Sequence, residues 1–163
     1  MRGRYSWSYR HTVEQCKIID ISWLSQHGYL CEFKAVGIEW RDSAGELTGS
    51  ISIEVSVPEA NSDTGYLRFM YTMTDRMTEE KTRHDYTVDL VTTPCNFGGF
   101  RYWFICSLVV NGRSCQRRVG KLYLPPDSDY FGCRHCHNLT YRCQKEHNKQ
   151  MDIFRKSLAL LLR

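Results

Sequence analysis

Residues 106–136 have the sequence CSLVVNGRSCQRRVGKLYLPPDSDYFGCRHC, which carries four cysteines in two pairs. Eight residues separate Cys106 from Cys115, two separate Cys133 from Cys136, and seventeen lie between the pairs. Paired thiols at such spacings bring four thiolates to one point, which is the ligand set of a structural Zn²⁺ ion. The spacing therefore predicts a zinc ribbon held by these four cysteines. Because four thiolates leave no open coordination position, we expect the zinc to be structural and not catalytic.

Other side chains near these pairs are alternative ligands. Cys95 precedes the first pair, His135 lies inside the second pair, and His137 follows it. We expect both histidines to point outward, and whether any of the three replaces a cysteine stays open. A cluster of reduced core cysteines is the alternative to a metal site, but Asn111-Gly112 and Gly132 supply the turns that a metal knuckle needs.

Length and composition favour a folded, reduced, metal-binding protein. The chain has 163 residues, of which 13% are aromatic, so it can form one ordinary domain or two small ones with a buried core. Residues 1–7 are not followed by an apolar signal core, and the longest apolar run, at 158–162, is far too short to span a bilayer. Eight cysteines in such a chain favour metal binding over a disulfide scaffold, and we expect a cytoplasmic protein without membrane contact.

The hydrophobic pattern predicts an α+β fold that is mainly β. We expect a small antiparallel N-terminal sheet with one short helix, followed by the zinc ribbon and a terminal helix. Asp20 and Gly28 fit the start and the end of the short helix within residues 18–30. Alternation of Ile51, Ile53, Val55 and Val57 predicts a strand with one buried face. Further strands are expected within 31–57 and at 65–74, 85–92, 101–105 and 117–124, with a charged loop at 75–84.

The predicted chain organisation has four parts. They are a flexible arm at 1–11, a β-rich N-terminal domain at 12–93, the zinc ribbon at 94–144 and a C-terminal amphipathic helix at 145–163. Pro94 and Gly98-Gly99 mark the start of the ribbon, because both residue types interrupt regular structure. In the last part, Met151, Phe154, Leu158 and Leu161 recur at helical spacing.

Charge is sorted along the chain, and the metal motif lies in its basic part. Residues 1–100 carry ten Lys or Arg and fourteen Asp or Glu, whereas residues 101–163 carry twelve and four. Such asymmetry is typical of a protein with an anionic partner. Guanidinium groups pair with phosphates and aromatic rings stack on unpaired bases, so we expect a nucleic-acid surface, with DNA favoured over RNA. The predicted nucleic-acid-binding residues are Arg113, Arg117, Arg118, Lys121, Arg134, Trp103 and Tyr123.

Two other functions are alternatives. The basic residues can be a solvated face, and the ribbon is then the scaffold of a protein-interaction adaptor or of an inhibitor of another cellular machine. Signatures such as a Gly-rich phosphate loop are absent, and no small-molecule substrate is evident. His135 and His137 faintly resemble the catalytic stretch of metal-dependent nucleases, but acidic ligands for a second metal are scarce. We therefore predict a non-enzymatic protein.

Five motifs carry a resemblance to a known family. They are TPCNFGG at 93–99, WFxC at 103–106, CxRRV at 115–119, LYL at 122–124 and FxCRxCxxLxY at 131–141. With these motifs the chain resembles a family of short, largely uncharacterised bacterial zinc-ribbon proteins that are often met among mobile-element genes. The resemblance implies a metal-binding ribbon on a β-rich N-terminal module and supplies no established activity. One position departs from the family, because Gln116 stands where its members usually have glycine.

Overall fold

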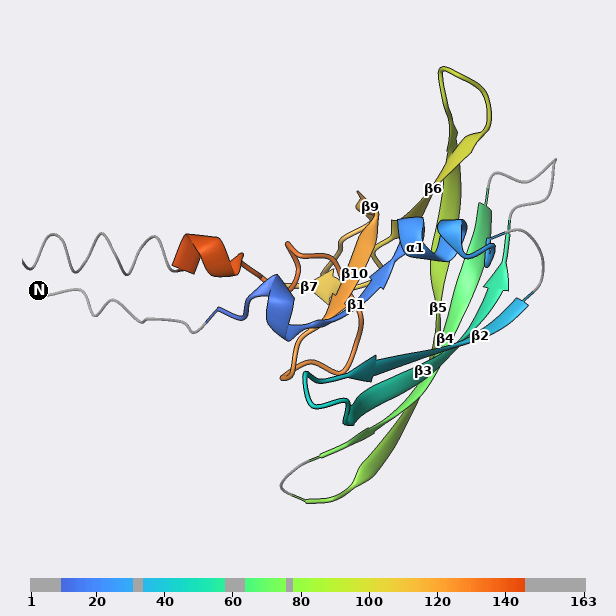
Figure 1. Cartoon of the computed structure of the whole chain (residues 1–163). Helices are drawn as coiled ribbons and strands as arrows, with labels where there is room; N and C mark the ends of the chain where they lie inside the picture. Colours follow the sequence, from blue (N-terminus) through green and yellow to red (C-terminus); the bar gives the residue numbers. More distant parts are fainter. Residues whose placement is uncertain (1–9, 31–33, 58–63, 76–77, 146–163) are drawn as a thin grey trace, which may run out of the picture.

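The computed structural model describes residues 10–30, 34–57, 64–75 and 78–145, and this part of the chain is mainly β, as expected (Figure 1). The labelled helices are the short 3-10 helix η1 (Val13–Gln15) and α1 (Ile21–Gln26), and residues 142–145 are also helical. The strands are β1 (Lys17–Asp20), β2 (Lys34–Arg41), β3 (Leu47–Ser56), β4 (Thr64–Thr74), β5 (Lys81–Pro94), β6 (Phe100–Ile105), β7 (Val109–Val110), β8 (Arg113–Ser114), β9 (Arg118–Val119) and β10 (Lys121–Leu124).

Six of these strands form the main sheet, in the order β2-β3-β4-β5-β6-β9. All its neighbouring strands are antiparallel. β1 pairs with β10, and β7 pairs with β8, in two further antiparallel pairs. The residues predicted as an N-terminal domain and as a ribbon therefore share one sheet, because β6 and β9 continue it beyond β5.

One face of the main sheet is buried beneath α1 and the β1–β10 pair, which lie together on one side of it in Figure 1. Ile51, Ile53 and Val55 alternate along β3 and are all buried, which confirms the predicted period of two. Ile21 and Leu24 of α1 belong to the same core cluster. The main core cluster therefore lies between two layers, the sheet on one side and α1 with the β1–β10 pair on the other.

The opposite, outer face of the sheet carries polar and charged side chains. Arg68 on β4 forms ion pairs with Glu54 on β3, at 3.4 Å, and with Asp85 on β5, at 2.7 Å. Both carboxylates are partly exposed, so water screens these pairs and they contribute little to stability. They nevertheless neutralise the basic group in the middle of this face.

The short helix forms where the sequence predicts it. Asp20 caps its N-terminus, because its side chain accepts a hydrogen bond of 2.8 Å from the backbone N–H of Ser22. Gly28 follows the helix with φ of +68°, a conformation that glycine adopts without the steric cost of a Cβ. Ile18, the first residue of the range in which the helix was expected, lies in β1 and pairs with Tyr123.

The predicted charged loop at 75–84 is shorter in the structure. Lys81 to His84 belong to β5 and pair with residues 71–74 of β4. The turn is closed where the backbone N–H of Asp75 donates to the carbonyl of Glu80, at 2.9 Å. His84 is buried and stacks on Tyr71, and this contact with a distant residue draws the charged segment into the sheet.

The single strand predicted at 117–124 is divided at Gly120. β9 pairs with β6 in the main sheet, whereas β10 pairs with β1. The carbonyl of Gly120 accepts a hydrogen bond of 2.9 Å from the backbone N–H of Ile21 at the start of α1. The chain therefore passes from one layer to the other at this residue.

The ends of the described part lie together, since Thr12 and Thr140 form a parallel bridge. Of the predicted arm at 1–11, only the last two residues are described, and of the predicted helix at 145–163 only the first. Residues 142–145 are helical. Within the described ranges, no helix is long and apolar enough to cross a membrane.

Candidate metal centre

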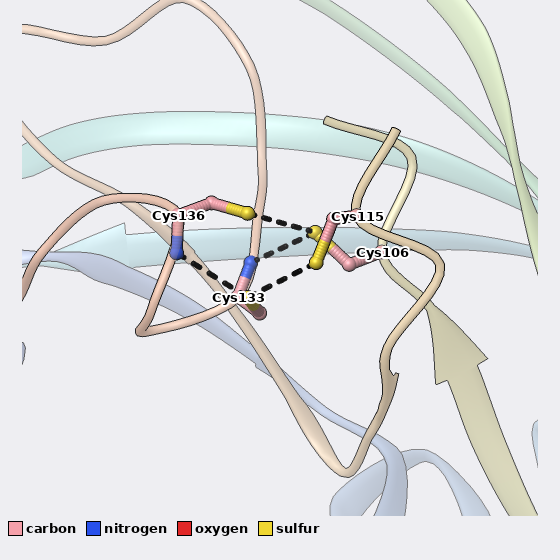
Figure 2. Close-up of side chains that lie close together, drawn as sticks. All are labelled: Cys106, Cys115, Cys133 and Cys136. Atoms are coloured by element: carbon pink, nitrogen blue, oxygen red, sulfur yellow. Dashed lines mark hydrogen bonds between the residues drawn. The ribbon is translucent and has the colours of Figure 1, made fainter. Parts of the chain in front are cut away.

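The four predicted cysteines converge on one point, as Figure 2 shows. Cys106 directly follows β6, Cys115 directly follows β8, and Cys133 and Cys136 lie on the loop after β10. Their sulfur atoms all lie within 4.8 Å of one another. All four are free thiols, so no disulfide competes with metal binding.

The distances between the sulfur atoms fit a tetrahedral ion. The Sγ atoms of Cys106 and Cys136 are 3.9 Å apart, and those of Cys115 and Cys133 are 3.8 Å apart. A tetrahedron with metal–sulfur bonds of about 2.3 Å has edges of about 3.8 Å. A disulfide would require a separation of about 2.05 Å. The cysteines are therefore spaced as ligands of one metal ion.

Backbone amides donate hydrogen bonds to two of the sulfur atoms. The N–H of Cys133 donates to Sγ of Cys106 at 3.3 Å, and the N–H of Cys136 donates to Sγ of Cys133 at 3.4 Å. Such donors favour the thiolate, which is the form that binds a metal. The pKa of Cys133 lies well below that of an ordinary thiol, chiefly because the Cys106 side chain is a hydrogen-bond partner of its sulfur, whereas the same contact raises the pKa of Cys106.

Cys106 and Cys115 are far apart in sequence because a hairpin is inserted between them. β7 and β8 pair over residues 109–114, and the turn between them consists of Asn111 and Gly112, with φ of 52° and 74°. Two positive φ values in a two-residue loop are those of a type I′ hairpin, so the predicted turn is confirmed. The N–H of Cys115 donates to the carbonyl of Leu108 at 2.9 Å and closes the hairpin at its base. Without the hairpin, two residues would separate Cys106 from Cys115, as in the second pair.

The alternative ligands lie outside the cluster. Among the described residues, the one group of three or more ligand side chains close enough to share an ion is the set of four cysteines. Cys95 is exposed, and so is His135, as expected. His137 is half-buried instead, and burial is the main cause of its lowered pKa.

The remaining described cysteines differ from each other. Cys16 is half-buried and donates a hydrogen bond of 3.3 Å to the carbonyl of Thr12, and burial raises its pKa to about 11. Cys143 is exposed. Cys31 lies outside the described residues.

The predicted nucleic-acid-binding residues have different surroundings. Arg113, Arg117 and Arg118 are exposed, and within the described ranges no ion pair joins them to a carboxylate. Lys121 is exposed but lies 2.9 Å from the Asp20 carboxylate, and this hydrogen bond raises the pKa of Lys121. Arg134 lies over the Tyr141 ring, 5.3 Å from its centroid.

The two predicted aromatic contacts are not equivalent. Tyr123 is only 8% exposed and packs against Val13 and Leu139, so its face is not available to a base. Trp103 is half-buried, and its Nε1 donates to Oγ1 of Thr93 at 2.9 Å. The structure therefore leaves Trp103 as the aromatic candidate of this set.

Sequence analysis missed Arg101, whose guanidinium carbon lies over the Trp103 ring at 4.3 Å from its centroid. It also missed the exposed rings of Phe97 and Phe100 on the hairpin between β5 and β6. The sequence did contain a signal for a basic surface here, because the chain has five Arg or Lys between Asp89 and Asp127 but no Asp or Glu.

Comparison of the chain with protein-family models, with curated proteins and with solved structures finds no significant match. The resemblance to short bacterial zinc-ribbon proteins therefore stays a prediction from the sequence. The residues and contacts of this chain are the basis on which its function must be inferred.

Proposed function

We propose that this chain is a non-enzymatic, cytoplasmic nucleic-acid-binding protein whose basic surface is organised by a structural Zn²⁺ ion. The observation that carries the proposal is the placement of three exposed arginines, Arg113, Arg117 and Arg118, within three residues of the cluster ligand Cys115. None of the three forms an ion pair with another residue that the structure describes. Bacterial or mobile-element origin, which the resemblance implies, fits such a function.

The geometry and chemistry of the cysteine cluster support zinc. Four thiolates in a tetrahedron are the ligand set of structural zinc, and a reducing cytoplasm keeps such thiols available. Tetrahedral sulfur sites also bind iron. Elemental analysis of protein purified without oxidation is expected to give one zinc per chain, and iron in its place would contradict the zinc assignment.

The unpaired arginines support an anionic partner. An exposed guanidinium without a carboxylate partner can form bidentate hydrogen bonds with a phosphate and loses no existing ion pair in doing so. Lys121 and Arg134 already contact Asp20 and Tyr141, so we assign them a smaller share of the binding. The segment between Asp89 and Asp127 presents no carboxylate that would repel a phosphate backbone.

Salt dependence of binding tests the nucleic-acid proposal. Fluorescence anisotropy with labelled DNA is expected to show affinity that falls linearly with salt on a logarithmic scale. The double variant Arg117→Gln, Arg118→Gln should weaken binding to every sequence and reduce the slope by about 1.4 to 1.8. Arg83→Gln is the matched control, because Arg83 is exposed on β5 at the end opposite Pro94. Affinity that ignores both salt and the double variant would refute the proposal.

A protein-interaction adaptor is the second candidate, and the β7–β8 hairpin favours it. Val109 is 65% exposed and Val110 is also exposed, although valine is usually buried. Adjacent exposed apolar side chains on a hairpin suit a protein partner. This function predicts little affinity for DNA or RNA, and a partner that is recovered by pull-down after nuclease treatment.

A further inference from the structure

The hairpin formed by β5 and β6 extends beyond its neighbours. Among the described residues, the pairing of β4 with β5 ends at Thr64 and Val91, whereas β5 and β6 pair with each other as far as Pro94 and Phe100. Residues 92–102 therefore extend beyond the main sheet as the end of the β5–β6 hairpin, which Figure 1 shows in yellow-green, and Trp103 lies at the base of this extension. A projecting ribbon has two open faces that can contact a partner.

This hairpin is rich in aromatic rings, of which only Tyr102 packs against the core cluster among the four named here. Phe97 at its tip is fully exposed, Phe100 is 69% exposed, and Tyr102 and Trp103 are half-buried. Large exposed rings in one place mark an interaction site more often than they mark chance. Aromatic side chains along an extended strand are what successive unpaired bases stack on.

The Trp103 ring of the β5–β6 hairpin already stacks with a guanidinium group. Arg101 and Trp103 are two residues apart on β6, so they share a face, and the Arg101 guanidinium lies over the Trp103 ring at 4.3 Å. The hydrogen bond from Trp103 Nε1 to Thr93 holds the ring in place. Unpaired bases stack on guanidinium planes as well as on aromatic rings. The pair is therefore a prearranged platform.

Positive charge beside the Arg101–Trp103 pair favours an anionic partner. Arg118 on β9 lies directly opposite Ile105 on β6, so Arg118 shares the outer face with Arg101 and Trp103. Further along this face, Arg68 is neutralised by Glu54 and Asp85. The unpaired positive charge thus lies beside the aromatic ribbon, where the phosphates of a stacked strand would run.

We propose that the β5–β6 hairpin binds single-stranded nucleic acid, with unpaired bases stacked on Phe97 at the tip and on the Arg101–Trp103 pair, and with Arg118 on the phosphates. The inference rests on the proposed nucleic-acid-binding function and adds the substrate class. A duplex keeps its bases stacked on each other and inaccessible to these rings, so it can use the arginines but not the platform.

Anisotropy with three labelled probes tests this inference: oligothymidylate, oligouridylate and a DNA duplex of the same length. The single strands should bind more tightly than the duplex, and comparison of the two single strands separates DNA from RNA. Trp103→Ala should weaken single-strand binding by about 5- to 100-fold and leave duplex binding unchanged, because stacking on one aromatic ring accounts for an effect of this size. Trp103→Phe should retain most of the affinity.

One control variant and one further test variant complete the experiment. Trp23→Ala removes an exposed tryptophan on α1, outside the hairpin, and should not change binding. Phe97→Ala removes a fully exposed ring that contributes nothing to the core, and it should weaken single-strand binding even if Trp103→Ala fails to fold.

The outcomes separate this inference from the proposed function. Equal or tighter duplex binding, or single-strand affinity unchanged in both Trp103→Ala and Phe97→Ala, overturns the single-strand platform; if Arg117→Gln, Arg118→Gln still weakens binding, the proposed function stands. Binding to none of the three probes refutes both.

Discussion

Gly132 lies where the two halves of the metal centre pack together. A Cβ on this residue would overlap Leu108 Cδ1, would lie 2.7 Å from Leu108 Cγ, and would lie 2.9 Å from Nε2 of His137. Leu108 belongs to the first knuckle and His137 follows the second. The absence of a side chain at Gly132 therefore permits the approach of one knuckle to the other.

Gly132→Ala is expected to destabilise the protein by about 1–3 kcal/mol, the usual cost of forcing atoms into a packed region, and to accelerate loss of the metal. Gly120→Ala is the matched control, since its Cβ would meet only Ile21 Cγ2, at an ordinary contact distance of 3.7 Å. Chemical denaturation and metal release to a chromogenic chelator measure the two effects. Equal behaviour of the two variants would contradict the packing argument.

Gln116 adopts a left-handed backbone conformation, with φ of 52°, directly after Cys115. The knuckle thus keeps the conformation for which glycine is suited, although a glutamine occupies the position. Left-handed geometry costs a residue with a Cβ about 1–2 kcal/mol, and glycine loses about 0.5–1 kcal/mol more backbone entropy on folding. The difference favours glycine slightly.

Gln116→Gly should therefore stabilise the metal-bound protein by about 0.5–1 kcal/mol in denaturant unfolding. The hydrogen bond from Gln116 Nε2 to Ser114 Oγ is exposed, so its loss changes little. Gln26→Gly, at the last residue of α1, provides the opposite expectation, because glycine lowers helix stability. A Gln116→Gly protein less stable than the parent would show that this residue is not strained.

At the scale of elements, the β7–β8 hairpin is an insertion into the first knuckle. The hydrogen bond from the N–H of Cys115 to the carbonyl of Leu108 closes the hairpin at its base. The hairpin can therefore be removed without changing which residues supply the thiols. A chain in which Leu108 joins directly to Cys115 should still bind one metal ion per molecule, as measured by elemental analysis. Loss of the metal from this deletion would show that the hairpin itself shapes the site.

Elements set by local patterns could be predicted, whereas elements set by distant partners could not. The capping by Asp20 and the alternation along β3 depend on neighbouring residues, and both are found in the structure. The division at Gly120 depends on pairing with β6 and with β1, which no local pattern encodes. The four cysteines could be found because their chemistry restricts their spacing, but the burial of Tyr123 depends on Val13 and Leu139.

At the scale of the whole molecule, the metal centre is connected to the hydrophobic core. Cys133 is two residues from Phe131, which is buried against Phe69 at 5.6 Å between ring centroids and faces Trp40 at 6.0 Å. Metal binding to four thiolates contributes folding free energy directly. The ion is therefore expected to stabilise both layers of the fold and not the cluster alone.

A strong chelator should remove the metal, lower the unfolding temperature and increase solvent exposure of Trp40, measured by thermal unfolding and by tryptophan fluorescence. Trp40→Phe identifies the part of the fluorescence change that comes from this residue. Re-addition of Zn²⁺ under reducing conditions should restore the parent values. Unchanged stability after complete metal removal would exclude a structural role for the ion.

The bridge between Thr12 and Thr140 brings the chain's entry into the described fold next to its exit. A unit whose ends meet in this way can be spliced into a surface loop of a host protein without stretching the host backbone. The fold from Thr12 to Thr140 is consequently suited to insertion as a domain into a loop of another protein.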